Sequence, residues 1–187
     1  KTVYLNYDPN SFVPALSSDR CIDYLKRRGI NLELAEKAGF LYAEDTSINT
    51  TKFNDRLCIP VYERKRLVSM EGRRLNPDGL GPKVLYPKNT SVDLLYDIDN
   101  LDFDCDVFAV EGLMDLFVLR SCSFFSNSTS IFGANVTKRQ LEQISKCKRF
   151  IYIYDLDDAG KKTVEQLRNS GLDNLYILRI PSSYKGV

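Results

Sequence analysis

Two short apolar runs in this 187-residue chain end abruptly in acidic residues and lead directly into segments with helical character. The first, residues 107–110, is followed by Glu111, and the second, residues 150–154, is followed by Asp155 and Asp157. Apolar runs of this length that alternate with helical segments predict buried parallel strands. Because open α/β sheets bind ligands beyond the carboxyl ends of their strands, the pattern predicts an acidic site there.

The acidic residues are spaced so that they can converge on one point. Asp155 and Asp157 are two residues apart in an extended segment and therefore face the same way. Glu111 can share that point if the two strands are neighbours, and Asp115 follows one helical turn later. The chain has no His, which excludes imidazole ligands and bases, and the remaining carboxylates suit Mg²⁺ or Mn²⁺. The alternative is that such acids cap helix N-termini, and we favour this only for Asp158.

The first part of the chain predicts a mixed α+β lobe. Residues 1–54 are expected to be mainly helical, with two short helices that end at Gly29 and Gly39. Such a pair could read DNA, but it is more often a packed αα-hairpin. Pro60 places the first strand of the lobe at an edge or a bulge. Strands are expected at 56–61, 67–75 and 83–86, with a loop at 76–82.

The second part predicts a largely parallel sheet covered by helices, which gives an α/β fold overall. Thr137 and Gln140 form a capping-box pattern, and Gly171 can end the last helix. The expected domains are a basic lobe, 1–105, and an α/β domain, 106–187, truncated at its C-terminal end. Strands are expected at 107–110, near 124–125, at 150–154 and at 175–180, and helices at 113–120, 138–146 and 159–169.

Charge is distributed unevenly along the chain, although its net value is only +1. Residues 56–88 contain eight Lys or Arg against three acids, whereas residues 89–115 contain eight acids and no Lys or Arg. A basic segment next to an acidic one suits a protein that holds polyphosphate and metal together. The alternative is two solvated faces of opposite sign.

The five cysteines show no CxxC spacing and are odd in number. They indicate reduced thiols in a cytoplasmic protein. No apolar run approaches the length of a membrane span. The chain does not begin with Met and reads as a fragment of something longer.

The acidic motifs carry a resemblance to a known domain. Glu111-Gly-x-x-Asp115, followed some forty residues later by Asp155-x-Asp157-x-Ala-Gly160, resembles the Toprim domain of primases, topoisomerases and some nucleases. A DxD alone is much weaker, because haloacid-dehalogenase-type phosphatases and glycosyltransferases share it. The segments 56–61, 72–75 and 82–89 are similar to those that precede Toprim in bacterial DnaG-type and phage primases. The resemblance covers residues 19–181.

The resemblance implies roles for individual residues. Glu111, Asp155 and Asp157 would be the catalytic metal ligands, with Asp115 in support. Two departures are Leu156, where a small or polar residue is usual, and Glu71, where cellular primases often have Gly. The residues implied to bind nucleotide or template phosphates are Arg73 and Lys83, with Arg56, Arg74 and Lys88 as helpers.

The implied activity is Mg²⁺- or Mn²⁺-dependent synthesis of RNA primers from NTPs on single-stranded DNA. The implied partners are the template, NTPs, a replicative helicase and an upstream zinc-binding domain absent from this chain, with no membrane. The location would be the cytoplasm of a bacterial or phage-infected cell. Two alternatives stay open, a Toprim nuclease that uses the same acids and a non-catalytic nucleic-acid-binding module, which Leu156 favours.

Overall fold

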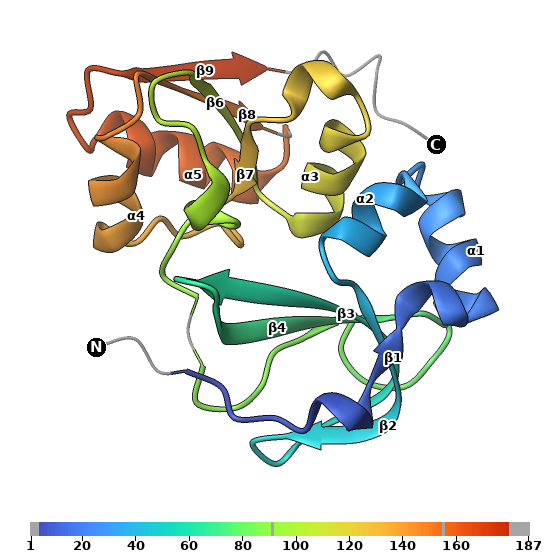
Figure 1. Cartoon of the computed structure of the whole chain (residues 1–187). Helices are drawn as coiled ribbons and strands as arrows, with labels where there is room; N and C mark the ends of the chain where they lie inside the picture. The colour runs from blue at the N-terminus through green and yellow to red at the C-terminus, as the bar shows by residue number, and fades with distance from the viewer. Residues whose placement is uncertain (1–3, 91, 155, 180–187) are drawn as a thin grey trace. The chain divides into compact units, whose positions relative to one another are not determined.

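The computed structural model describes residues 4–90, 92–154 and 156–179. The chain forms two compact units, unit 1 up to Val92 and unit 2 from Asp93 (Figure 1). The domain boundary expected between residues 105 and 106 stays a prediction, and it falls at the first strand of unit 2.

Unit 1 is built around an antiparallel sheet with the simplest possible order, β1-β2-β3-β4-β5. Two tight turns make this meander. Asn49 and Thr50 join β2 to β3, and Arg64 and Lys65 join β3 to β4, all four with left-handed φ. Two-residue turns of this kind match the twist of a hairpin. The strands are β1 (Val13–Pro14), β2 (Leu41–Ile48), β3 (Thr51–Glu63), β4 (Arg66–Arg74) and β5 (Val84–Leu85).

Two short helices precede most of this sheet, as predicted: α1 (Asp19–Arg27) and α2 (Leu32–Lys37). Gly29 and Gly39 follow them with φ of +70° and +69°, a conformation that favours glycine. The Asn31 side chain caps α2 by accepting from the N–H groups of Glu33 and Leu34. Single-turn 3-10 helices lie at Pro9–Ser11 and Ala15–Ser17.

The prediction that residues 1–54 are mainly helical is wrong, because they contain β2 and the start of β3. The sequence obscures β2, since Glu44 and Asp45 interrupt the alternation of apolar and polar residues that marks a strand. The prediction for Pro60 is confirmed. The last β2–β3 pair is Leu41–Cys58, so Pro60 has only β4 beside it, and a register irregularity follows at Val61 and Tyr62.

Unit 2 confirms the predicted α/β fold. Within the described residues of this unit, four strands pair in parallel in the order β7-β6-β8-β9. The strands are β6 (Asp106–Val110), β7 (Ser128–Ser130), β8 (Arg149–Tyr154) and β9 (Leu175–Arg179). The helices between them are α3 (Leu113–Arg120), α4 (Lys138–Ile144) and α5 (Asp158–Arg168), and a 3-10 turn lies at Ile98–Asn100. The capping box of Thr137 and Gln140 is present at α4.

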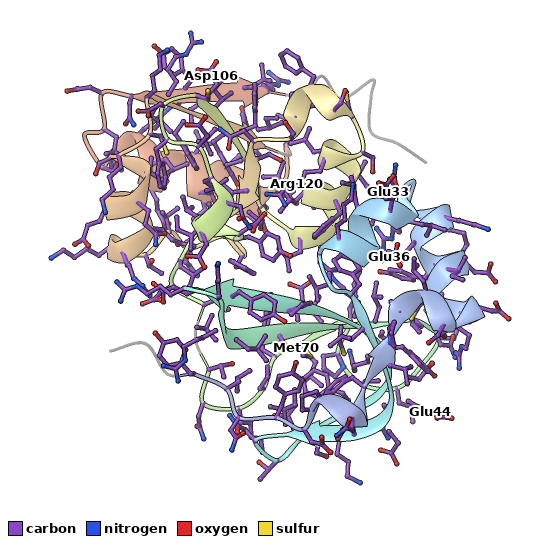
Figure 2. The ribbon with its side chains drawn as sticks, viewed as in Figure 1. Glu33, Glu36, Glu44, Met70, Asp106 and Arg120 are labelled. Carbon is purple, nitrogen blue, oxygen red and sulfur yellow. The ribbon has the colours of Figure 1, made fainter. Side chains whose placement is uncertain are left out.

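Alternate side chains of β6 and β8 form the core of unit 2 with α4 and α5 (Figure 1). Val107, Ala109, Phe150 and Tyr152 are fully buried. Ile144, Val164 and Leu167 of the two helices belong to the same cluster, as do Leu95, Ile131 and Cys147. At the N-terminal ends of β6 and β8, Asp106 (labelled in Figure 2) accepts two 2.6 Å hydrogen bonds from its register partner Arg149. This bidentate pair favours the observed register.

The strand predicted near residues 124–125 is wrong. Ser123–Phe125 is a 3-10 turn, in which Phe124 and Phe125 pack edge to face with centroids 5.0 Å apart. The strand is β7, three small polar residues that are completely buried. Because these residues are polar, they lack the apolar pattern that marks a buried strand in a sequence. Two of their hydroxyls donate to backbone carbonyls, that of Thr129 to Tyr96 O and that of Ser130 to Glu111 O.

All five cysteines are free thiols, and Cys21, Cys58 and Cys147 are buried. Burial raises the pKa of the Cys21 thiol to about 11. Across the described ranges, every helix is too short or too polar to cross a lipid bilayer.

Candidate active site and cationic pocket

The acidic residues predicted as metal ligands follow neighbouring strands. β6 and β8 pair directly and in parallel, from Asp106–Arg149 to Ala109–Tyr152. Glu111 comes one residue after β6, so its strand end and that of β8 meet at one edge of the sheet. The adjacency that this site requires is therefore confirmed.

Glu111 is anchored through its backbone. Its carbonyl oxygen accepts from the Ser130 hydroxyl at 2.8 Å and from the Gly133 N–H at 3.2 Å. Phe132 and Gly133 both have positive φ, which turns the chain after β7 back toward the end of β6. This turn, which lies between the two acidic motifs in the sequence, thus anchors the Glu111 backbone.

Asp157 is the N-cap of α5, and its carboxylate accepts from the Gly160 N–H at 2.8 Å. The expectation that Asp158 caps this helix is wrong. Asp158 is the first helical residue, and its carboxylate pairs with Lys161 at 3.2 Å. The N-cap is Asp157 and not Asp158 because the backbone is still extended at Asp157, with φ of −80° and ψ of 174°. A carboxylate has several lone pairs, so a cap bond does not prevent metal binding.

The other predicted metal ligands are Glu111, Asp115 and Asp155. Asp115 lies in the first turn of α3 and is exposed, and Glu111 is partly exposed. Asp155 lies outside the described residues. Among the residues that the structure describes, no three acidic, Cys or His side chains are placed to hold a metal. The metal-ligand assignment therefore stays a prediction, with carboxylate chemistry that suits Mg²⁺ or Mn²⁺.

Unit 1 contains a cavity of about 400 Å³ whose wall carries four cationic side chains. Lys83 and Arg74, both predicted to bind phosphate, line it together with Arg27, the last residue of α1, and Arg28, its C-cap. Arg27 and Arg28 were not among the residues predicted from the sequence. The run Lys26-Arg27-Arg28 at the end of a short helix was the available signal. Tyr24, Leu75 and Pro77 supply apolar wall.

Arg74 and Arg56 donate hydrogen bonds to main-chain carbonyls of the loop 76–82. Arg74 donates to the carbonyls of Pro77 and Gly81, each at 2.7 Å, and also to that of Gly79. Arg56, which is only 5% exposed, donates to Gly72 O at 3.0 Å and to Pro82 O at 2.9 Å. Burial lowers the pKa of this guanidinium.

Gly72 makes room for this arrangement. A Cβ at this position would lie 2.6 Å from the Phe53 ring and 3.2 Å from the Arg56 side chain. Glycine therefore leaves the space that the Phe53 ring and the Arg56 side chain occupy over β4.

The Arg73 side chain forms an ion pair with Glu71, the residue that stands where cellular primases often have Gly. The Glu71 carboxylate, 2% exposed, accepts from Arg73 Nε at 2.6 Å and from the Tyr86 hydroxyl. The register explains the group, because Glu71 and Arg73 share one face of β4, and Tyr86 follows β5 next to Glu71. Burial, followed by the charge of Glu71, raises the pKa of Tyr86. Lys88, the last predicted contact, is exposed.

Comparison with known proteins places these features in a family context. Residues 108–185 match the sequence model of the family described as Toprim-like. The chain is 28% identical over 184 residues to the DNA primase of Staphylococcus aureus (strain MSSA476), covering 89% of this chain and 29% of that protein. It is also 28% identical over 155 residues to the DNA primase of Campylobacter jejuni, covering 78% and 26% respectively. The chain thus spans less than a third of these curated relatives.

Solved structures share the fold. The Aquifex aeolicus primase, in a structure of its zinc-binding and RNA polymerase domains, superimposes with a TM-score of 0.73 at 24% identity, over 90% of this chain and 51% of that one. The primase fragment of the bacteriophage T7 primase-helicase gives 0.69 at 17% identity, over 95% and 70%. The chain is thus similar in sequence to bacterial DNA primases, shares its fold with solved bacterial and phage primase structures, and matches the Toprim-like family within unit 2.

Proposed function

We propose that this chain is the catalytic core of a DNA primase, which joins NTPs into RNA primers on single-stranded DNA. The observation that carries the proposal is the extent of the similarity. A Toprim-like domain alone would suit a nuclease equally well, but the similarity to DNA primases covers 89% of the chain and so includes unit 1.

We assign the metal-binding role to Glu111, Asp155 and Asp157, with Asp115 in support. The donors fit a hard divalent cation, because they are carboxylates that follow β6 and β8 in the sequence, and these two strands pair directly. Mg²⁺ or Mn²⁺ bound there would stabilise the negative charge that develops as an NTP α-phosphate is attacked.

The basic residues have different roles in this proposal. Lys83, Arg27 and Arg28, whose side chains line the cavity, would hold phosphates of nucleotide or template. Arg56 and Arg74 would act mainly by shaping the loop 76–82, to which their guanidinium groups donate. Arg73 would contact phosphate in the orientation set by Glu71, and exposed Lys88 would contribute charge.

The proposed partners are single-stranded DNA, NTPs, a replicative helicase and a zinc-binding domain. The last two come by analogy from relatives whose names include a zinc-binding domain and a helicase. A cytoplasmic location in a bacterial or phage-infected cell stays part of the same proposal.

The test is primer synthesis by the full-length protein with labelled NTPs on single-stranded template. Glu111→Gln and Asp157→Asn should abolish synthesis. Asn is as good an N-cap as Asp, so Asp157→Asn leaves α5 capped and isolates the chemical role of the carboxylate. Asp158→Asn changes the adjacent exposed carboxylate, which pairs with Lys161 and does not cap α5; it is the matched control and should remain active.

Synthesis at the wild-type rate in both variants would show that the chemistry lies elsewhere. Cleavage of labelled single strands without NTPs, lost in the same two variants, would instead support the nuclease alternative.

A further inference from the structure

Leu80, in the loop 76–82 of unit 1, is completely exposed. Its side chain is 100% accessible, whereas the other exposed large apolar side chains of the described residues range from 40% to 74%. Single exposed apolar side chains are common on protein surfaces, so exposure alone does not indicate a function. The loop that carries Leu80 is also held by hydrogen bonds from two arginines, which sets this side chain apart from an ordinary exposed residue.

The loop is held in one shape before any ligand binds. Arg74 and Arg56 donate to four of its carbonyls, those of Pro77, Gly79, Gly81 and Pro82. Asn76 closes a turn at its start, where its side chain accepts from the Asp78 N–H at 3.0 Å and its carbonyl from the Gly79 N–H at 3.2 Å. Ordering a loop costs conformational entropy, which these charge-assisted hydrogen bonds offset. Leu80 is therefore displayed on a preorganised support.

The same loop borders the cationic cavity. Pro77 lines it beside Arg27, Arg28 and Lys83. Pro77 and Asn76 also line a second cavity, where Arg20 and Lys26 add two more cations and Asp23 adds one acid. One short segment thus combines a fixed apolar side chain with a wall that suits phosphates.

This combination fits single-stranded nucleic acid, in which phosphates and unpaired bases lie within reach of the same site. Cations hold the backbone of such strands, and apolar or aromatic side chains pack against their bases. Leu is among the residues that proteins insert between bases. A duplex would have to be kinked and unstacked to present a base to Leu80, whereas a single strand presents its bases without that cost, and a protein partner would not require so many cations.

We propose that the loop 76–82 is a base-contact element, in which Leu80 packs against an unpaired base of a strand whose phosphates are held by Arg27, Arg28 and Lys83. This inference rests on the proposed function, because it takes single-stranded nucleic acid as the ligand. It adds an apolar, salt-independent contribution to the affinity for the template, from a residue outside the acidic site.

The experiment measures binding of a fluorescent single-stranded oligonucleotide to the intact protein at several salt concentrations. Leu80→Ser should weaken binding by about five- to tenfold, the effect of losing partial burial of one Leu side chain. The salt dependence should not change, since no phosphate contact is lost. Leu80→Phe should restore the affinity. Val13→Ser, which changes another exposed apolar residue of unit 1, is the control and should bind like wild type.

A second oligonucleotide of the same length with abasic positions identifies the contacted group. Wild type and Leu80→Ser should bind this strand equally, because it keeps the phosphates but lacks the bases. Normal binding of the intact strand by Leu80→Ser would overturn the inference, as would an equal loss on both strands. A wild-type protein that binds neither strand would refute the proposed function as well, which separates the two failures.

Discussion

Replacement of Glu71 tests whether Arg73 depends on a buried ion pair. Glu71 is 2% exposed, and the Arg73 side chain is 11% exposed. Glu71→Leu would remove both hydrogen bonds to the carboxylate and leave a guanidinium largely buried without its counter-charge. Breaking a buried pair from one side costs about 3–5 kcal/mol of the free energy of unfolding. Arg73→Met leaves the carboxylate as the unpaired charge and should cost a similar amount.

The double variant Glu71→Leu/Arg73→Met should be more stable than the sum of the single changes predicts. It leaves no buried charge, and apolar replacements of a buried pair are often close to neutral. If the double variant is close to neutral, the coupling energy equals the sum of the two single losses, about 6–10 kcal/mol from these figures. Glu33→Gln, which breaks the exposed pair with Lys37, is the control and should change stability little.

The assay is denaturant unfolding followed by far-ultraviolet circular dichroism, since the chain has no Trp to report by fluorescence. Additive single effects, or a loss below about 1 kcal/mol in Glu71→Leu, would refute the reasoning, because both contradict a buried, mutually dependent pair. Arg73 would then be available to bind phosphate without Glu71 as its positioning partner.

Two further predictions concern charge and pH. Lys83→Ala should lower the magnitude of the salt slope of single-stranded DNA binding by roughly 0.7. The control is Lys52→Ala, on β3 and outside the cavity, which should leave the slope unchanged. A slope for Lys83→Ala equal to that of the wild type would show that Lys83 makes no phosphate contact. Stability should fall as pH rises from about 9. Above that value the unfolded Cys21 thiol ionises, while burial keeps it protonated in the folded state up to about pH 11. A pH titration of the unfolding midpoint should be flatter in Cys21→Ala, and an unchanged profile would contradict this.

Local sequence signals determined much of unit 2. The apolar runs, the Thr137–Gln140 capping box and the acids after the strands are short-range features, and they placed α3 at its observed bounds, Leu113–Arg120. The acidic motif also pointed to the Toprim-like domain that the comparison then matched. These predictions succeeded because periodicity and capping depend on residues only a few positions apart.

The tertiary structure alone decided which strands are neighbours and what the arginines do. The pairing of β6 with β8, which brings Glu111 to the end of the strand before Asp157, joins segments about forty residues apart. Arg56 donates to the carbonyls of Gly72 and Pro82, and a main-chain carbonyl is present at every residue, so such partners leave no mark in the sequence. The fold class could therefore be inferred from sequence, whereas the division of the basic residues into loop supports and cavity lining required the folded chain.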